Sequence, residues 1–154
     1  MSTFDPNAFL ETTIEGVNDT VLLPPPAGEF LLLAEKIEGK TWSAKDDPSK
    51  SGLKLIVHWS IQDESVKTMM GRDKVTVKQD IMLDLVEGTN NLDMGKGRNV
   101  GLGRLRAALD LNKPGEPFTY SMIVGRMVKG TIKHRPDPKN SEIVYAEVSA
   151  VAKI

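Results

Sequence analysis

The sequence contains no cysteine, only two histidines and few aromatic residues. Without thiols the chain forms no disulfide, thiolate zinc site or cysteine nucleophile, which suits a reducing compartment. His58 and His134 stand apart from each other and from any zinc-binding motif, so we expect no metal site. Stability is therefore expected to come from the packing of a hydrophobic core.

Long apolar runs are also missing. No stretch approaches the roughly 18 apolar residues of a membrane span, and the chain does not start with the charged-then-apolar pattern of a signal peptide. We therefore expect no membrane partner and a cytoplasmic location, which for a viral protein is the host cytoplasm. The length of 154 residues, 40% of them hydrophobic, indicates one domain with tails.

An excess of positive charge, typical of nucleic-acid binders, is absent, because the formal net charge is −1. The charge is unevenly distributed, however. Residues 1–29 hold five acidic and no basic residues, which leaves 16 of the 21 acidic residues against all 20 basic ones in the remainder. The sequence thus predicts an acidic N-terminal arm, residues 1–27, ahead of a weakly basic domain, residues 28–154. Apolar residues between Phe4 and Leu22 allow the arm to pack on that domain, and three prolines end the arm in extended geometry.

Five segments of the domain have the pattern of β-strands. Residues 29–37 form an apolar run, and residues 53–61 and 75–85 alternate between apolar and polar positions. Residues 127–135 and 143–154 follow, joined by a proline-containing hairpin connection. In the last strand Val148, Ala150 and Ala152 are expected to face the core, and Trp59 is expected to be a core residue of the second strand.

One helix is expected between the third and fourth strands. Leu102, Leu105 and Ala108 recur at helical spacing, and Asn99 is a plausible N-cap. Residues 118–124 fit either a short helix or an extended link. The resulting order, β-β-β-α-β-β, is that of the OB-fold, an all-β five-stranded barrel with one helix. A β-sandwich usually needs about seven strands.

Ligands of OB-folds lie across strands two and three, between the loop joining strands one and two and the loop joining strands four and five. A single-strand binder needs cations for phosphates and aromatic faces for bases. Trp42 is expected in the polar loop 38–52, where it stacks bases or anchors the loop, and Tyr145 on an outer face. The candidate nucleic-acid-binding residues are Lys40, Trp42, Lys45, Lys50, Lys54, His58, Lys78, Lys96, Arg98, Lys129, Lys133, Arg135, Lys139 and Tyr145.

These candidates also have structural interpretations that involve no ligand. Each lysine taken singly fits solubilising surface, and the glycines around Lys96 suit either a phosphate-binding loop or a flexible one. The combined placement around two loops is the stronger signal.

Motifs for catalysis are incomplete. A dinucleotide fingerprint fails because position 100 is Val, and a phosphate-binding Walker loop fails because Gly97 stands where Ser or Thr is required. Asp80 and Asp84 share a strand face, where a nuclease would hold a metal ion, but solvated surface acids explain them more simply. We therefore expect no catalytic residue, no cofactor and no enzyme activity.

Four segments carry a resemblance to a known family. They are Gly28-Glu29-Phe30, residues 53–61, residues 99–109, and Gly125-Arg126-Met127-Val128-Lys129-Gly130. In these four segments the chain resembles a family of small phage-encoded proteins. Members of this family are found among replication and recombination genes and are considered single-stranded DNA binders. The resemblance covers most of residues 28–154. It implies an OB-fold and a role in phage-type DNA replication or recombination.

The sequence is compatible with two functions from different classes. The first is sequence-nonspecific binding of single-stranded DNA, with replication or recombination proteins as further partners of the acidic arm. In that case the arm either recruits such a partner or competes with DNA for the basic groove. The alternative is a protein-interaction or virion-assembly module that binds no nucleic acid. A homo-oligomer is compatible with both.

Overall fold

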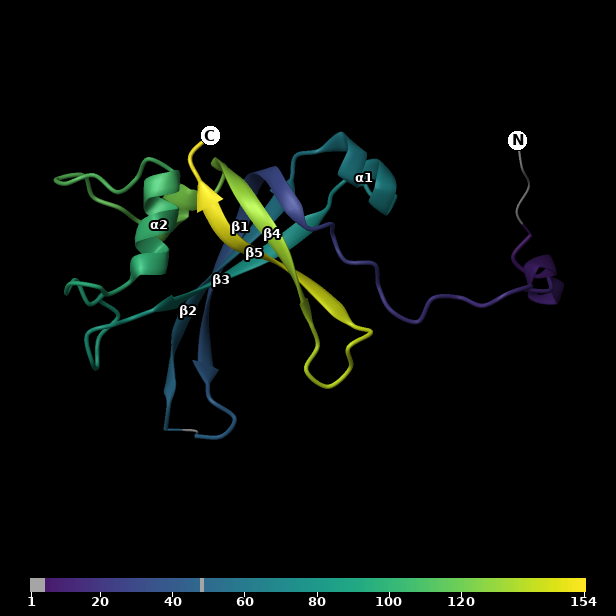
Figure 1. Ribbon diagram of the computed structural model, residues 1–154, viewed down its shortest axis with the longest axis horizontal. Helices are drawn as coiled ribbons and strands as arrows, with labels where there is room; N and C mark the ends of the chain where they lie inside the picture. The colour runs from purple at the N-terminus through teal and green to yellow at the C-terminus, as the bar shows by residue number, and fades with distance from the viewer. Residues whose placement is uncertain (1–4, 48) are drawn as a thin grey trace.

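The computed structural model describes residues 5–47 and 49–154, so Phe4 of the predicted arm lies outside the described residues. Figure 1 shows the elements arranged around a barrel. The strands are β1 (Gly28–Ser43), β2 (Ser51–Ile61), β3 (Thr76–Leu83), β4 (Met127–Pro136) and β5 (Val144–Ala152). The helices are α1 (Glu64–Met70) and α2 (Val100–Ala108), with short 3₁₀ turns η1 (Ala8–Glu11) and η2 (Tyr120–Ile123).

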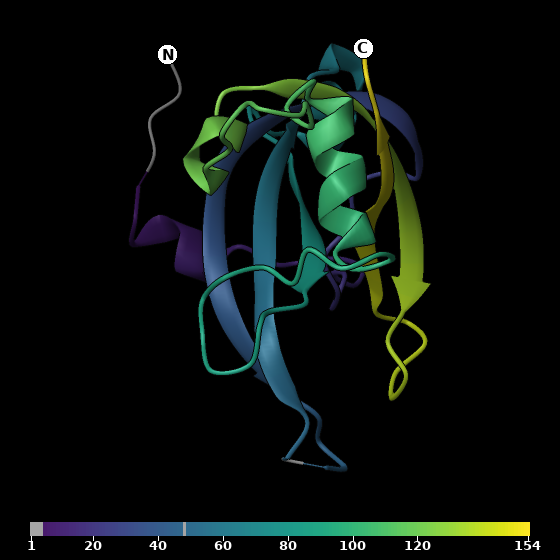
Figure 2. The ribbon, with the colours of Figure 1, turned by 90° about the vertical axis from the view of Figure 1, so that its left-hand side faces the viewer.

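The strands close in the order β1-β2-β3-β5-β4, with β4 returning to β1. The long β1 makes this possible, because its first part pairs with β4 and its remainder with β2, as Figure 2 shows. β3 and β5 are parallel neighbours that meet at one pair, Lys78 and Glu147. With α2 between β3 and β4, this is an OB-fold-like barrel, and the predicted fold class is confirmed.

The core fills the barrel interior and continues under α2. Trp59 is fully buried, as predicted, and its indole Nε1 donates a hydrogen bond to Gln79 Oε1 at 3.0 Å, so that the buried N–H is satisfied. Gly130 lies on the inner side of β4, where a Cβ would come within 2.2 Å of Leu32 Cδ1. The interior therefore has no space for a side chain at this position.

The predicted helix is α2, and Leu102, Leu105 and Ala108 are buried as expected. Asn99 is the N-cap residue of α2, as predicted, although its side chain makes no capping hydrogen bond. Its amide instead accepts a hydrogen bond from Asp84 N at 2.7 Å and donates to Asp84 O and Asp93 O at 2.9 and 3.0 Å. These hydrogen bonds hold the β3–α2 loop in place. The backbone of Asn99 has a positive φ of 53°, which Asn tolerates better than most residues.

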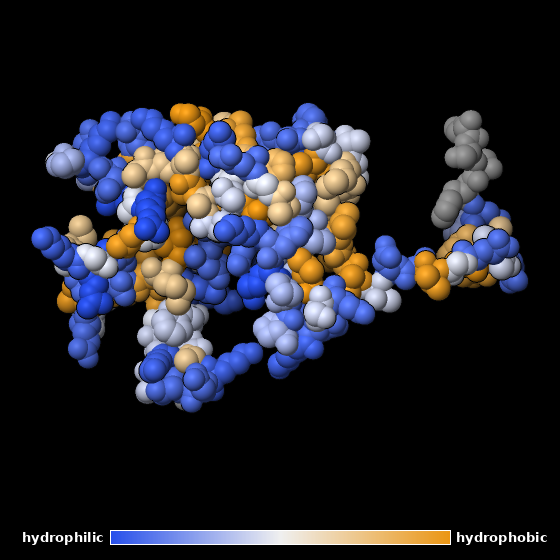
Figure 3. Space-filling model, in the orientation of Figure 1, coloured by the Kyte–Doolittle hydropathy of each residue, from blue (hydrophilic) through white to orange (hydrophobic). Residues whose placement is uncertain are grey.

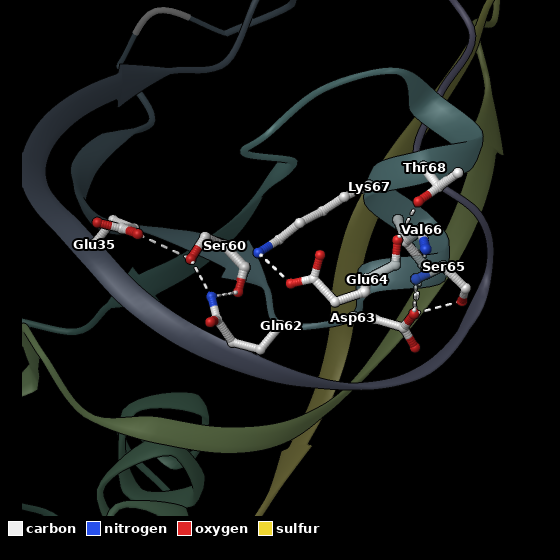
Figure 4. A network of polar contacts seen from close by, with 9 residues as sticks. All are labelled: Glu35, Ser60, Gln62, Asp63, Glu64, Ser65, Val66, Lys67 and Thr68. Carbon is white, nitrogen blue, oxygen red and sulfur yellow. Dashed lines mark hydrogen bonds and ion pairs between the residues drawn. The ribbon is translucent and has the colours of Figure 1, made fainter.

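The connection between β2 and β3 contains α1, which the strand pattern did not predict. Asp63 caps this helix by accepting hydrogen bonds from Ser65 N at 2.9 Å and Val66 N at 3.2 Å. Gly71 ends it in the left-handed conformation. Beside the cap, Gln62 donates to Ser60, whose hydroxyl donates to Glu35, as Figure 4 shows.

Two register shifts were not foreseen. One lies in β1 between Ala34 and Lys36. The other lies opposite Thr131 and Ile132, where β5 carries one extra residue. Beyond this bulge Ala150 and Ala152 are exposed while Val151 packs against the core, so the prediction that both alanines face the core is wrong.

Within residues 118–124, for which the sequence left a short helix or an extended link open, Tyr120–Ile123 form the 3₁₀ turn η2 and residues 118–119 form a link. Residues 5–27, ahead of β1, contain η1 and an extended stretch, which leads away from the barrel in Figure 1. Among the described residues no helix has the length and apolar character needed to span a membrane.

Candidate nucleic-acid interface

The outer face of β1, β2 and β3 carries a group of cations. The cross-strand register sets Lys40 opposite Lys54, and His58 between Lys36 on β1 and Lys78 on β3. These positions alternate with core residues such as Val57 and Trp59, so the side chains point outward. We call the group formed by Lys36, Lys40, Lys54, His58 and Lys78 the basic face.

Two carboxylates lie within the basic face and each engages one of its cations. His58 Nε2 lies 2.8 Å from Glu38 Oε1, and Lys54 Nζ lies 2.8 Å from Asp80 Oδ2. The hydrogen bond with His58 is the largest of the influences that lower the pKa of Glu38. The pairs hold their side chains in place and neutralise part of the charge.

The two loops that flank OB-fold ligands project from the same end of the barrel in Figure 1 and form separate hydrophilic projections in Figure 3. The β1–β2 loop spans residues 44–50 and contains Lys45 and Lys50. The β4–β5 loop spans residues 137–143 and contains Lys139. All three lysines are exposed. Pro48, part of the predicted loop, lies outside the described residues.

The prediction that Lys40 and Trp42 lie in a loop is wrong. Both lie in β1, which continues to Ser43. Trp42 pairs across the strands with Gly52, and a Cβ on Gly52 would lie 2.8 Å from the indole Nε1. That nitrogen is buried and, within the described residues, has no hydrogen-bond partner. The indole thus covers the glycine, a known way of stabilising a strand at this residue. The arrangement favours the anchoring role over base stacking.

On the neighbouring strands Arg135 and Tyr145 form a second group. The Arg135 guanidinium lies 5.4 Å from the centre of the Tyr145 ring, and its Nε lies 3.5 Å from Glu147 Oε2. The Tyr145 hydroxyl donates to Asp137 Oδ2 at 2.7 Å, and this bond is the largest cause of its raised pKa. Both groups meet at a pocket of about 370 Å³, lined by Lys78, Asp80, Arg135, Tyr145, Ala146, Glu147 and Val148.

Several lysines around these surfaces form no close ion pair with a carboxylate, although the charges of Lys36 and Lys40 help to lower the pKa of Glu38. Within residues 5–47 and 49–154, seven of these lysines have no ion pair within 4.0 Å. Each of the seven belongs to the basic face, to one of the two loops or to the outer side of β4. Their charge is available to an anionic ligand. They are Lys36, Lys40, Lys45, Lys50, Lys78, Lys133 and Lys139.

Three predicted site residues lie elsewhere. Lys96 and Arg98 belong to the β3–α2 loop, where Arg98 lies 3.7 Å from Asp93 and lines a pocket against α2. Lys129 stands at the end of β4 opposite to the β4–β5 loop and lies 3.7 Å from Glu29. The structure therefore does not bring these three residues together with the basic face.

Two cations at the interface were missed. Lys36 faces outward because of the register shift next to it, a feature that simple alternation does not predict. Arg72 follows α1 and shares a pocket with Lys78 and Tyr145. The helix that places Arg72 was itself missed, although Asp63 and Gly71 are recognisable cap residues.

A metal-dependent site at Asp80 and Asp84 gains no support from the geometry. Asp80 is engaged by Lys54, and Asp84 lies beyond the end of β3, next to Asn99. Within the described part of the chain, no cluster of three or more His, Asp or Glu side chains is arranged to hold a metal ion.

No protein-family model matches the chain, and no curated protein matches it.

Proposed function

We propose that this protein binds single-stranded DNA without sequence specificity, in phage-type DNA replication or recombination. The observation that carries the proposal is the set of seven lysines that form no ion pair among the described residues and lie around the strands and loops with which OB-folds bind ligands. Lysine contacts phosphates as a point charge, so binding through these residues carries little sequence information. The phage setting rests on the sequence resemblance alone.

The bases need contacts as well as the phosphates. Tyr145 is 43% exposed and stands beside Arg135, so the ring and the guanidinium plane together offer a surface on which a base can stack. Trp42 contributes less, because its indole covers Gly52. The scarcity of exposed aromatic rings suits a binder that depends mainly on charge, with affinity that falls steeply with salt.

Fluorescence titration with oligo-dT across a range of salt concentrations tests the proposal. If all seven lysines contact phosphates, the plot of log K against log salt has a slope of about −5, from about −0.7 per contact on single strands. An RNA oligonucleotide and a DNA duplex serve as comparison ligands. The absence of oligo-dT binding even at low salt would exclude the proposal.

One observation favours a second function, protein interaction without nucleic-acid binding. The arm exposes apolar side chains, with exposed fractions of 70% for Leu10, 73% for Ile14 and 99% for Val17. Such residues in an extended acidic segment suit docking to a replication or recombination protein, or to another copy of the chain. Salt-insensitive association with such a partner, together with no oligo-dT binding, would support this function over the first.

A further inference from the structure

The end of the arm that adjoins β1 lies against the barrel. Residues 20–25 line a pocket of about 590 Å³ together with Arg72, Thr76, Lys78, and residues 143–146 of the β4–β5 hairpin. His134 Nε2 lies 2.6 Å from the carbonyl oxygen of Pro25, so the ring N–H donates this hydrogen bond. Pro24, Pro25 and Pro26 are half-buried, whereas residues 5–23 are exposed.

This contact overlaps with the candidate interface. Lys78 belongs to the basic face, and Tyr145 belongs to the neighbouring group with Arg135, yet both also line the pocket that residues 20–25 of the arm line. A nucleic-acid strand that approaches Lys78 and Tyr145 through this pocket meets residues 20–25, which line it as well. The arm and such a strand therefore contact the same side of Lys78 and Tyr145.

Charge does not hold the arm in this place. Among the residues that the structure describes, Glu11, Glu15 and Asp19 form no ion pair with the barrel within 4.0 Å. The contact consists of apolar and proline surface together with the hydrogen bond from His134. It is also shallow, because Leu22 and Leu23 remain 83% and 62% exposed. A shallow contact is readily reversible.

We propose that residues 20–25 are a built-in competitor of single-stranded DNA, which displaces them from Lys78 and Tyr145 when it binds. The inference rests on the proposed function and adds a regulatory step to it. Because competition is reciprocal, undocking the arm strengthens DNA binding and DNA undocks the arm. An arm docked in nine molecules of ten would weaken the apparent affinity about tenfold.

A first experiment follows the arm directly in the full-length chain. The sequence has no cysteine, so Val21→Cys introduces a single labelling site within the contact, for an environment-sensitive dye. Val17→Cys, at a position that is 99% exposed, is the matched control. We expect oligo-dT to change the signal at position 21 with the midpoint of DNA binding, and to change the signal at position 17 little. DNA binding with no change at position 21 overturns the inference.

A second experiment measures the effect of the arm on affinity. Replacing residues 20–25 by glycine and serine in the full-length chain removes the apolar contact but keeps the acidic residues. We expect this variant to bind oligo-dT up to about tenfold more tightly. The control variant Glu11→Gln/Glu15→Gln/Asp19→Asn keeps the contact and removes charge, and its affinity should stay within about twofold of the unmodified chain at moderate salt.

The outcomes separate the inference from the function on which it rests. If the charge control alone reproduces the gain, the arm acts by electrostatic repulsion and the competitor model is wrong. If the glycine-serine variant and the unmodified chain bind equally well, the model is also wrong, while DNA binding stands. If none of the variants binds oligo-dT, the proposed function fails, and the inference fails with it.

Discussion

Replacement of Lys40 by Gln gives a sharp test of the proposed interface. Lys40 is exposed on β1, has no ion pair within 4.0 Å in the described residues, and stands opposite Lys54. Loss of one phosphate contact on a single strand should reduce the salt slope by about 0.7, which corresponds to about fivefold weaker binding, or about 1 kcal/mol, at 0.1 M salt. The assay is the oligo-dT titration repeated across salt.

Lys129→Gln is the matched control for this variant. It removes the same charge from an outward position of the same barrel, but at the end of β4 away from both loops. We expect its slope and affinity to equal those of the unmodified chain. Equal losses in the two variants would show that net charge, and not the basic face, governs binding, and would refute the reasoning.

We do not expect Lys40→Gln to destabilise the fold. Lys40 and Lys54 are like charges directly opposite each other on neighbouring strands, and such a pair is destabilising. The replacement should therefore leave the urea midpoint unchanged or raise it slightly. Weaker DNA binding in a variant of undiminished stability can be assigned to the lost contact.

Three further predictions concern the fold. Gly130→Ala should lower the free energy of unfolding by about 1–3 kcal/mol in urea titrations, because the new Cβ overpacks Leu32; unchanged stability would contradict the packing described. Gly52→Ala should displace the indole of Trp42 and change tryptophan emission, and an identical spectrum would mean that the indole does not cover the glycine. The pKa of Asp63 is lowered, first by the Ser65 hydroxyl and then by Val66 N–H, so its contribution to stability is present above the unfolded pKa and lost as the pH falls through the folded one. Asp63→Ala should thus lower the urea midpoint more at neutral than at acidic pH, and an equal effect at both would count against the cap.

Much of the fold could be predicted from the sequence because its strands alternate clearly. Trp59 sits in such an alternating run, and α2 presents Leu102 and Leu105 at helical spacing. The extension of β1 to Ser43 was not predicted, since the polar residues after Ile37 are held in a strand by pairing with β2 and not by their own preferences. Tertiary pairing determined this element.

The interface was predicted less completely. The outward positions of Lys54, His58 and Lys78 followed from alternation, and the register brings them together. Lys36 was missed because a bulge leaves no periodic signal. Lys129 was included because alternation shows the face of a strand but not how far along the barrel a residue lies.

The single ladder pair between β3 and β5 has a mechanical consequence. Strands distant in sequence close the barrel there through one parallel pair, Lys78 and Glu147, so this seam is the barrel's least reinforced join and the place where local opening should begin. Lys78 stands on one side of the seam, and Arg135 and Tyr145 on the other. A polyanion that binds Lys78 together with Arg135 and Tyr145 would connect the two sides of the seam and reduce its local opening. Amide hydrogen exchange along β3 and β5 should therefore be slower when the ligand is bound.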